Sequence, residues 1–296
     1  MNSILPFTAI IGMDLVKKSL LYHAIDPRLG GLLLMGHRGC AKSTLSRAFR
    51  DILSFTENSE VPFVEVPLGT TEDRLLGSID ASTLLKKGEW STKIGLIQLA
   101  NGGVLYIDEI NLLPDYLVDS LLDSSTSGQH RIEREGLSQN VNARYILIGS
   151  MNPEEGDLRP QLTDRFTHGI LVRDEFSVDQ RKEIVRIRME FDDAPELFIE
   201  KHHKNQEDLK KQIIQARLNL KNVEISENLR NQVAEKASLL NLEGVRAELG
   251  VIRTVRCATA WRGEKIVSEA DLEEAWMLCL GHRKDNFKAE KKKINN

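Results

Sequence analysis

The fold of this chain is decided by the stretch Gly36-His37-Arg38-Gly39-Cys40-Ala41-Lys42-Ser43. An apolar run at 31–35 precedes it, and a helix-compatible segment at 44–50 follows it. A buried strand, a tight glycine-containing loop and a helix start bind nucleotide phosphates, because loop N–H groups and the positive end of the helix dipole point at the anion. The pattern predicts that Lys42 reaches the β- and γ-phosphates and that the Ser43 hydroxyl holds Mg²⁺.

The loop departs from the usual pattern where Ala41 stands in place of a glycine before the lysine. An alanine follows such a loop only with a negative φ or under strain. The alternative interpretation is an ordinary strand–turn–helix unit with a lysine at its helix start. The helix dipole disfavours a basic side chain at that end, so this alternative leaves Lys42 unexplained.

Composition indicates an ordinary globular protein, with 41% hydrophobic and 28% charged residues among 296. There is no run of about 18 apolar residues, so we expect no membrane span. The beginning of the chain does not resemble a secretory signal. Three cysteines, Cys40, Cys257 and Cys279, lack metal-ligand spacing and favour a reduced, cytoplasmic setting. The net charge of -4 makes nucleic acid an unlikely main partner.

The first part of the chain alternates apolar strands with helical segments. Besides the run before the loop, we expect strands at 61–66, 104–107, 145–148 and 169–172. Helices are expected at 44–52, 95–100 and 116–123. Near-continuous apolar strands separated by helices predict a parallel sheet covered on both faces. Right-handed crossovers then place the carboxyl ends of the strands, and hence the chemistry, on one edge.

The character of the sequence changes from about Phe176 onward, where strand signals disappear and helix formers dominate. We expect helices at 206–220, 226–240, 248–262 and 269–280. These segments predict a second, all-helical domain. Pro195 and the polar segment 201–207 are the expected link between the two parts.

Polar residues follow two of the predicted strands. Asp108 and Glu109 end the strand near 104–107; Asp108 is placed to hold Mg²⁺ beside Ser43, and Glu109 to polarise a water for attack on the γ-phosphate. The alternative is a strand end followed by an acidic turn. Asn152 follows the next strand and can orient the attacking water, or it can simply begin an Asn–Pro turn.

Three arginines are candidates for stabilising charge in the transition state. Arg159 and Arg165 precede the last strand, and an arginine offered to a neighbouring subunit's γ-phosphate accelerates hydrolysis by roughly 10³ to 10⁵. For each of them the alternative is surface ion pairing. Arg246 begins a helix of the second domain and could reach back over the phosphates, or it could be a solvated helix-start residue.

Segments along nearly the whole chain resemble AAA+ ATPases of the magnesium-chelatase I-subunit type, which are related to MoxR-like ATPases. The resemblance is carried by segments 6–12, 25–31, 67–74, 106–113 and, most specifically, 152–162. It implies an α/β P-loop AAA+ core with a parallel sheet flanked by helices at 1–190, followed by a helical linker at 191–225 and a smaller all-helical lid domain at 226–296. A helix-2 insert is expected at about 78–95, and a hairpin before sensor 1 at about 128–145.

The resemblance also implies roles for individual residues, with ATP and Mg²⁺ as cofactors. The Walker A loop that binds the nucleotide comprises Gly36, His37, Arg38, Gly39, Cys40, Ala41, Lys42, Ser43 and Thr44. Asp108 and Glu109 match Walker B, and Asn152 matches sensor 1. Arg165 matches the arginine finger, Arg246 matches sensor 2, and Arg159 matches a second trans-acting arginine. Ile11 and Gly12 would lie near the adenine. The family forms rings, usually hexamers, with ATP between subunits.

We therefore expect an ATP-hydrolysing ring motor that remodels or activates a partner protein, which the resemblance suggests has a von Willebrand A domain. The first alternative is a genuine magnesium-chelatase motor subunit that drives Mg²⁺ insertion into protoporphyrin. The segment near 54–62 is short where chelatase subunits of pigment-making organisms usually carry a long insertion, which counts against that alternative. The second alternative is a nucleotide-gated scaffold with little turnover.

Overall fold

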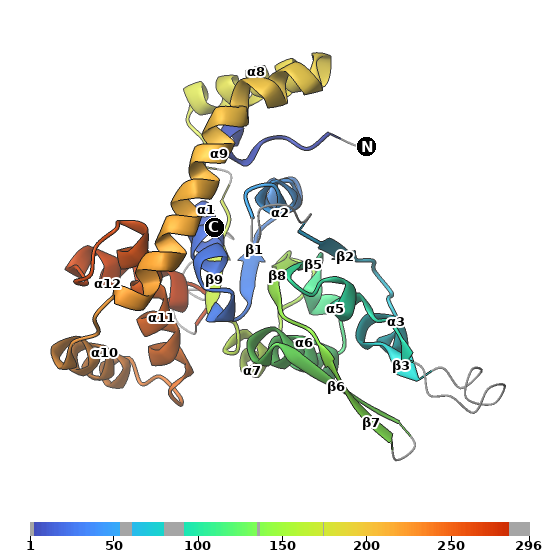
Figure 1. Ribbon diagram of the computed structural model, residues 1–296, viewed down its shortest axis with the longest axis vertical. Helices are drawn as coiled ribbons and strands as arrows, with labels where there is room; N and C mark the ends of the chain where they lie inside the picture. The colour runs from blue at the N-terminus through green and yellow to red at the C-terminus, as the bar shows by residue number, and fades with distance from the viewer. Residues whose placement is uncertain (1–2, 54–60, 80–91, 135–136, 174, 284–296) are drawn as a thin grey trace.

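The computed structural model describes residues 3–53, 61–79, 92–134, 137–173 and 175–283. Its centre is a five-stranded sheet in the order β2-β5-β8-β1-β9, in which every neighbouring pair is parallel (Figure 1). The strands are β1 Leu32–Met35, β2 Phe63–Val66, β5 Gly103–Ile107, β8 Tyr145–Met151 and β9 His168–Leu171. Each predicted apolar run forms one of these strands, so the predicted parallel α/β sheet is confirmed.

Side chains of β1 alternate between two hydrophobic cores, one on each face of the sheet. Leu32 and Leu34 belong to a core that includes side chains of α1 (Asp14–Ile25), α2 (Lys42–Arg50) and α9 (Pro195–Asn219). Leu33 and Met35 belong to a core that includes side chains of α5 (Leu96–Leu99) and α6 (Asp115–Ser127). The alternation follows from the two-residue period of a strand. The helices around the sheet are α1 Asp14–Ile25, α2 Lys42–Arg50, α3 Glu72–Leu76, α5 Leu96–Leu99, α6 Asp115–Ser127 and α7 Pro160–Thr163.

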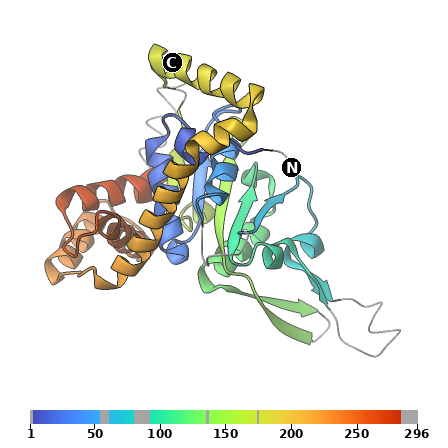
Figure 2. The same cartoon turned by 45° about the horizontal axis from the view of Figure 1, so that its top comes forward.

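Two antiparallel ribbons leave the sheet. β6 (Gln129–Arg134) pairs with β7 (Leu137–Asn142) where the hairpin at 128–145 is expected, and the ribbon points away from the sheet in Figures 1 and 2. β3 (Ser78–Ile79) pairs with β4 (Thr92–Lys93) at the two ends of the expected helix-2 insert. The rest of that insert, and most of the short segment near 54–62, lie outside the described residues.

The second part of the chain is helical throughout its described length, apart from its connecting turns. It consists of α8 Val178–Asp193, α9 Pro195–Asn219, α10 Glu227–Leu239, α11 Arg246–Trp261 and α12 Glu269–Leu280. Pro195 begins α9 at the position where proline is best tolerated, and the polar segment 201–207 lies inside α9. Its Lys, Gln and Glu side chains are good helix formers, so polarity alone does not break the helix. None of the helices in the described part of the chain has the length and apolar character that a membrane crossing requires.

Helices α10, α11 and α12 form a small domain, called the lid below, that packs against the sheet. The lid has its own core, yet Cys257 and Leu278 belong to the same hydrophobic cluster as core-domain residues of α1 and β9. His168 of β9 joins the two parts, because its Nδ1 lies 2.8 Å from the Ser19 hydroxyl of α1 and its Nε2 lies 2.8 Å from the Thr254 hydroxyl of α11. The lid is therefore fixed to the sheet near β9 and α1.

Candidate functional site

The loop between β1 and α2 has the backbone that the sequence predicts, with one strained residue. A side chain at Gly36 would bring a Cβ to 2.6 Å from the Val172 carbonyl oxygen, so glycine is required there. Gly39 has φ 88°, and Ala41, which ends the loop, has φ 57°. A non-glycine residue in this left-handed region costs about 1–2 kcal/mol. Of the two possibilities for Ala41, the structure therefore has the strained one.

Lys42 is held inside the loop. Its ammonium donates hydrogen bonds to the carbonyl oxygens of Gly36 (2.6 Å) and His37 (2.8 Å), and the residue is only 8% exposed. A solvated lysine at a helix start would be exposed instead. The loop carbonyls therefore compensate the unfavourable helix dipole and hold a buried positive charge where the loop amides begin the helix.

The two carboxylates after β5 are each held by a different partner. Asp108 Oδ1 accepts hydrogen bonds from the Ser150 hydroxyl and from the Tyr106 hydroxyl at 3.2 Å. Burial raises the pKa of Tyr106, so its phenol stays protonated and remains a donor. Glu109, whose φ is 54°, accepts a hydrogen bond from Arg38 Nη2 at 2.7 Å. The acidic-turn alternative does not account for these links to the neighbouring strand and to the loop.

Asn152 follows β8 and is 7% exposed. Its side-chain oxygen accepts a hydrogen bond from the Glu154 N–H at 3.2 Å, which is the turn contact that the Asn–Pro alternative predicts. The same side chain also lines the pocket described next, so the turn serves to position it.

One pocket of about 480 Å³ collects these groups where the adjacent strands β1, β5 and β8 end. Its lining consists of Arg38, Gly39, Cys40, Ala41, Lys42, Ser43, Thr44, Tyr106, Asp108, Glu109, Ser150, Met151 and Asn152. The Ser43 hydroxyl and the Asp108 carboxylate are hard oxygen donors, which suit Mg²⁺. Cys40 is buried at 4% exposure, so its thiol is shielded from solvent.

Tyr106 and Ser150 are pocket residues that the sequence analysis did not identify. Ser150 reaches Asp108 because β8 pairs with β5, which only the strand order reveals. Tyr106 lies in β5, two residues before Asp108. From the sequence alone, its aromatic side chain is typical of an ordinary core residue.

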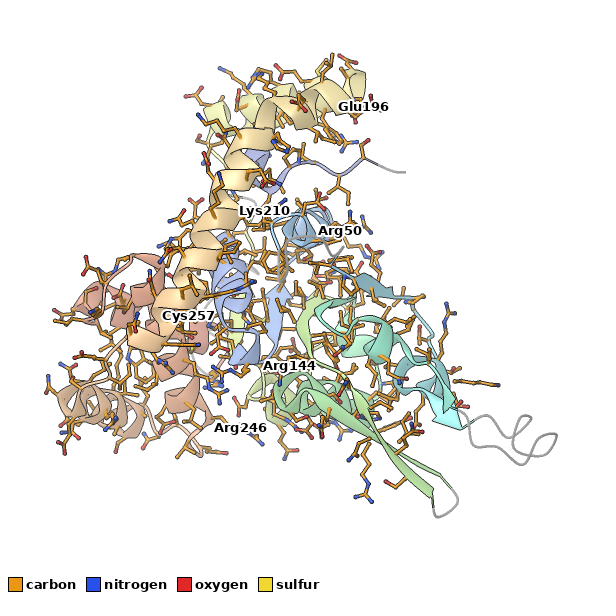
Figure 3. All side chains as sticks on the ribbon, viewed as in Figure 1. Arg50, Arg144, Glu196, Lys210, Arg246 and Cys257 are labelled. Carbon is orange, nitrogen blue, oxygen red and sulfur yellow. The ribbon has the colours of Figure 1, made fainter. Side chains whose placement is uncertain are left out.

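The predicted catalytic arginines lie elsewhere. Arg165 follows α7 and forms ion pairs with Asp119 and Asp123 of α6, which raise the pKa of its guanidinium although its burial acts in the opposite direction. Arg165 and Arg246 both line a second pocket of about 230 Å³ between α6 and α11, and Figure 3 shows Arg246 at the edge of the lid beside the α6–α7 segment. Arg159 is exposed and pairs with Asp115 at 2.7 Å.

From the sequence, Arg246 could have reached back over the phosphates of its own chain. In the structure it does not line that phosphate pocket. Tertiary packing explains this position of Arg246, because the lid packs against α1 and β9 and so keeps the start of α11 beside α6. Ile11 and Gly12 also lie outside the lining of that pocket. Ile11 packs with Phe191 and Phe198 of α8 and α9, and Gly12 lies against Phe176. Their proximity to an adenine remains a prediction.

Comparison with known proteins agrees with this arrangement. A model described as an AAA domain of the dynein-related subfamily matches residues 31–166, and an AAA lid domain model matches residues 230–296. The magnesium-chelatase subunit ChlI of Mesostigma viride is 41% identical over 312 residues, covering 94% of this chain and 87% of that protein. A structure of the complex between subunits BchI and BchD of magnesium chelatase contains a chain that matches with a TM-score of 0.56 and 38% identity, covering 95% of this chain and 96% of that one.

An uncharacterized protein of Mycobacterium tuberculosis is also 41% identical, over 280 residues that cover 94% of this chain. This chain spans only 44% of the length of that relative. The alignment with the Mesostigma subunit is longer than this entire chain of 296 residues, so the chelatase subunit contains segments that this chain lacks.

Proposed function

The chain belongs to the AAA+ proteins of the magnesium-chelatase subunit I type, and on this premise we propose that it is an ATP-hydrolysing ring motor that remodels or activates a partner protein. One observation carries the proposal. The phosphate loop, two carboxylates and a buried amide line one pocket, whereas Arg165 and Arg246 line another. A complete hydrolytic site then requires two copies of the chain.

Within the phosphate pocket each group has a chemical role in this proposal. The loop amides and Lys42 would bind the phosphates, and Ser43 and Asp108 would hold Mg²⁺, which neutralises charge on the phosphate oxygens when bound. Glu109 would polarise the attacking water, and Asn152 would orient it. Arg38 keeps the Glu109 carboxylate in place through its 2.7 Å hydrogen bond.

The second pocket would supply the other half of the hydrolytic site. Arg165 would stabilise the γ-phosphate charge of a neighbouring subunit. Because Arg246 lines the same pocket, we assign it to the same interface rather than to the phosphates of its own chain. Arg159 is exposed and pairs with Asp115 at the start of α6, outside the lining of this pocket.

The genuine magnesium-chelatase subunit is the second candidate function, and the names of the chelatase relatives favour it. The long alignment with the Mesostigma subunit supports the partner-remodelling function instead, because this chain lacks segments that the chelatase subunit contains. The two candidate functions differ in the partner and not in the ATP chemistry.

A mixing experiment tests the hydrolytic proposal. Glu109→Gln subunits should bind ATP and form rings without hydrolysis, and Arg165→Ala subunits should be inactive alone. Their mixture should recover ATPase activity, because each supplies the group that the other lacks. A mixture that stays inactive, or a monomer that hydrolyses ATP at the full rate, contradicts the proposal, and a wild-type protein with no turnover supports the scaffold alternative.

The two partner hypotheses need a separate measurement. ATP-loaded Glu109→Gln protein should retain its partner from a lysate of the source cells, and mass spectrometry would identify it. Recovery of a protein with a von Willebrand A domain and no porphyrin-binding subunit supports the remodelling function. Protoporphyrin metallation by the wild-type protein together with the captured subunits supports the chelatase function instead.

A further inference from the structure

One face of α6 carries an aspartate at every fourth position, and all three are paired with candidate interface arginines. Residues four apart in a helix share a face, so Asp115, Asp119 and Asp123 form a stripe. Asp115 pairs with Arg159 at 2.7 Å, and the other two aspartates pair with Arg165. The arginines approach this helix from the segment between β8 and β9, far away in sequence.

Arg165 is held at two points. Its Nη1 donates to Asp119 and its Nη2 donates to Asp123, so each terminal nitrogen has a different carboxylate partner. A guanidinium is planar and carries five N–H donors, so two anchors fix its plane and leave three donors for another acceptor. The Arg165 side chain is 17% exposed, whereas the side chains of Asp119 and Asp123 are 45% and 72% exposed.

We propose that Asp119 and Asp123 are positioning residues that orient Arg165 for the phosphate of the neighbouring subunit. This inference rests on the proposed function, in which Arg165 acts across the interface. An unanchored arginine loses side-chain rotamer entropy when it docks, and a misplaced charge stabilises a transition state poorly. The two carboxylates remove that freedom before the subunits meet.

The positions of Asp119 and Asp123 predict which kinetic constant changes when the two aspartates are substituted. Neither aspartate lines the phosphate pocket, so neither takes part in binding ATP to its own chain. They act only through Arg165, whose contribution is to the transition state. Their loss should therefore lower kcat of the neighbouring site and leave KM for ATP unchanged.

The test uses mixed rings in which one subunit supplies only the arginine. Glu109→Gln subunits are the donors of Arg165, and Arg165→Ala subunits are the acceptors whose own Glu109 is intact. We expect that Asp119→Asn with Asp123→Asn in the donor lowers kcat of the mixture about tenfold, with KM for ATP within about twofold of the parent mixture.

Two controls accompany the test. The same aspartate changes in the acceptor should leave the mixture at the parental rate, because Arg165 is already absent there, and this control also reports whether the changed subunit folds and assembles. Glu183→Gln with Glu190→Gln in the donor is a matched control on α8, since those two carboxylates hold Arg186 in the same way. It should leave kcat unchanged.

Three results for the aspartate variants would overturn the inference. An unchanged kcat shows that the aspartates do not position the arginine, and an increased kcat shows that they restrain it instead. A raised KM at constant kcat assigns them to assembly. If the parent mixture of Glu109→Gln and Arg165→Ala is itself inactive, the proposed function fails and this inference fails with it; an active parent mixture with unaffected aspartate variants rejects the inference alone.

Discussion

Acidification should weaken the junction between the lid and the sheet, because three buried histidines meet there. His23, His168 and His282 are essentially inaccessible to solvent, and the ring of His168 lies edge-on to that of His23 at 4.9 Å between centroids. Burial lowers the pKa of His23 to about 4 and of His282 to about 3, and lowers the pKa of His168 well below its usual value.

The sign and size of the effect follow from these pKa values. An unfolded histidine has a pKa of about 6.5, so below that pH the unfolded chain binds protons that the folded chain excludes, and stability falls as the pH falls. At pH 5 His23 and His282 each cost about 2 kcal/mol relative to pH 8, and the lowered pKa of His168 adds to this loss. Typical domains are stable by only about 5–15 kcal/mol, so this loss is a large fraction of the total.

Urea denaturation at pH 8, 7, 6 and 5 provides the assay. Trp276, buried in the lid core, reports the loss of lid packing by fluorescence. The matched variant is His23→Asn, whose amide can replace the contact that His23 Nδ1 makes with the Ser19 carbonyl oxygen at 2.8 Å. It should reduce the pH-dependent loss by about 2 kcal/mol, because one titrating group is removed.

Asp26 and Asp271 contribute little to the change in stability between pH 8 and pH 5. The pKa values of Asp26 and Asp271 are lowered by hydrogen bonds to arginines that outweigh their burial, so their contribution is lost mainly below pH 4. A free energy of unfolding that is equal at pH 8 and pH 5 would refute the reasoning. An unchanged pH dependence in His23→Asn would remove His23 from the explanation.

The remaining predictions concern single residues. Ala41→Gly should stabilise the protein by about 1 kcal/mol in urea denaturation, because it relieves the left-handed strain, and a destabilised variant would contradict that strain. Lys42→Ala should abolish ATP binding in calorimetry while the circular dichroism spectrum is preserved; retained affinity would count against the phosphate loop. Asp271→Asn should cost about 2 kcal/mol, since it weakens charged hydrogen bonds with Arg262 and Thr259, and hydrogen exchange should increase in α12 first. Exchange that stays unchanged there would show that the ion pair contributes little.

The sheet and the phosphate pocket could be predicted because their signals are local. Apolar runs mark the strands, and a parallel sheet brings their carboxyl ends together, so Lys42, Asp108 and Asn152 meet in one pocket as expected. The loop glycines and the lysine follow from the same short pattern.

The parts that could not be predicted depend on contacts distant in sequence. Arg246 lies beside Arg165 only because the lid docks on α1 and β9, and no residue near 246 encodes that docking. The uninterrupted run of α9 through 201–207 needed the structure, since polar residues favour both loops and solvated helices. The φ of Ala41 needed the structure, since sequence left both possibilities open.

The lid and the sheet of one copy are joined by a common hydrophobic cluster and by the hydrogen bonds of His168. Rotating one against the other would separate apolar side chains and leave buried polar atoms without partners, so this junction resists such a rotation. In the proposed ring, the mechanical work of nucleotide turnover would then be delivered at the contacts between copies, and the β6–β7 ribbon would move together with the copy to which it belongs.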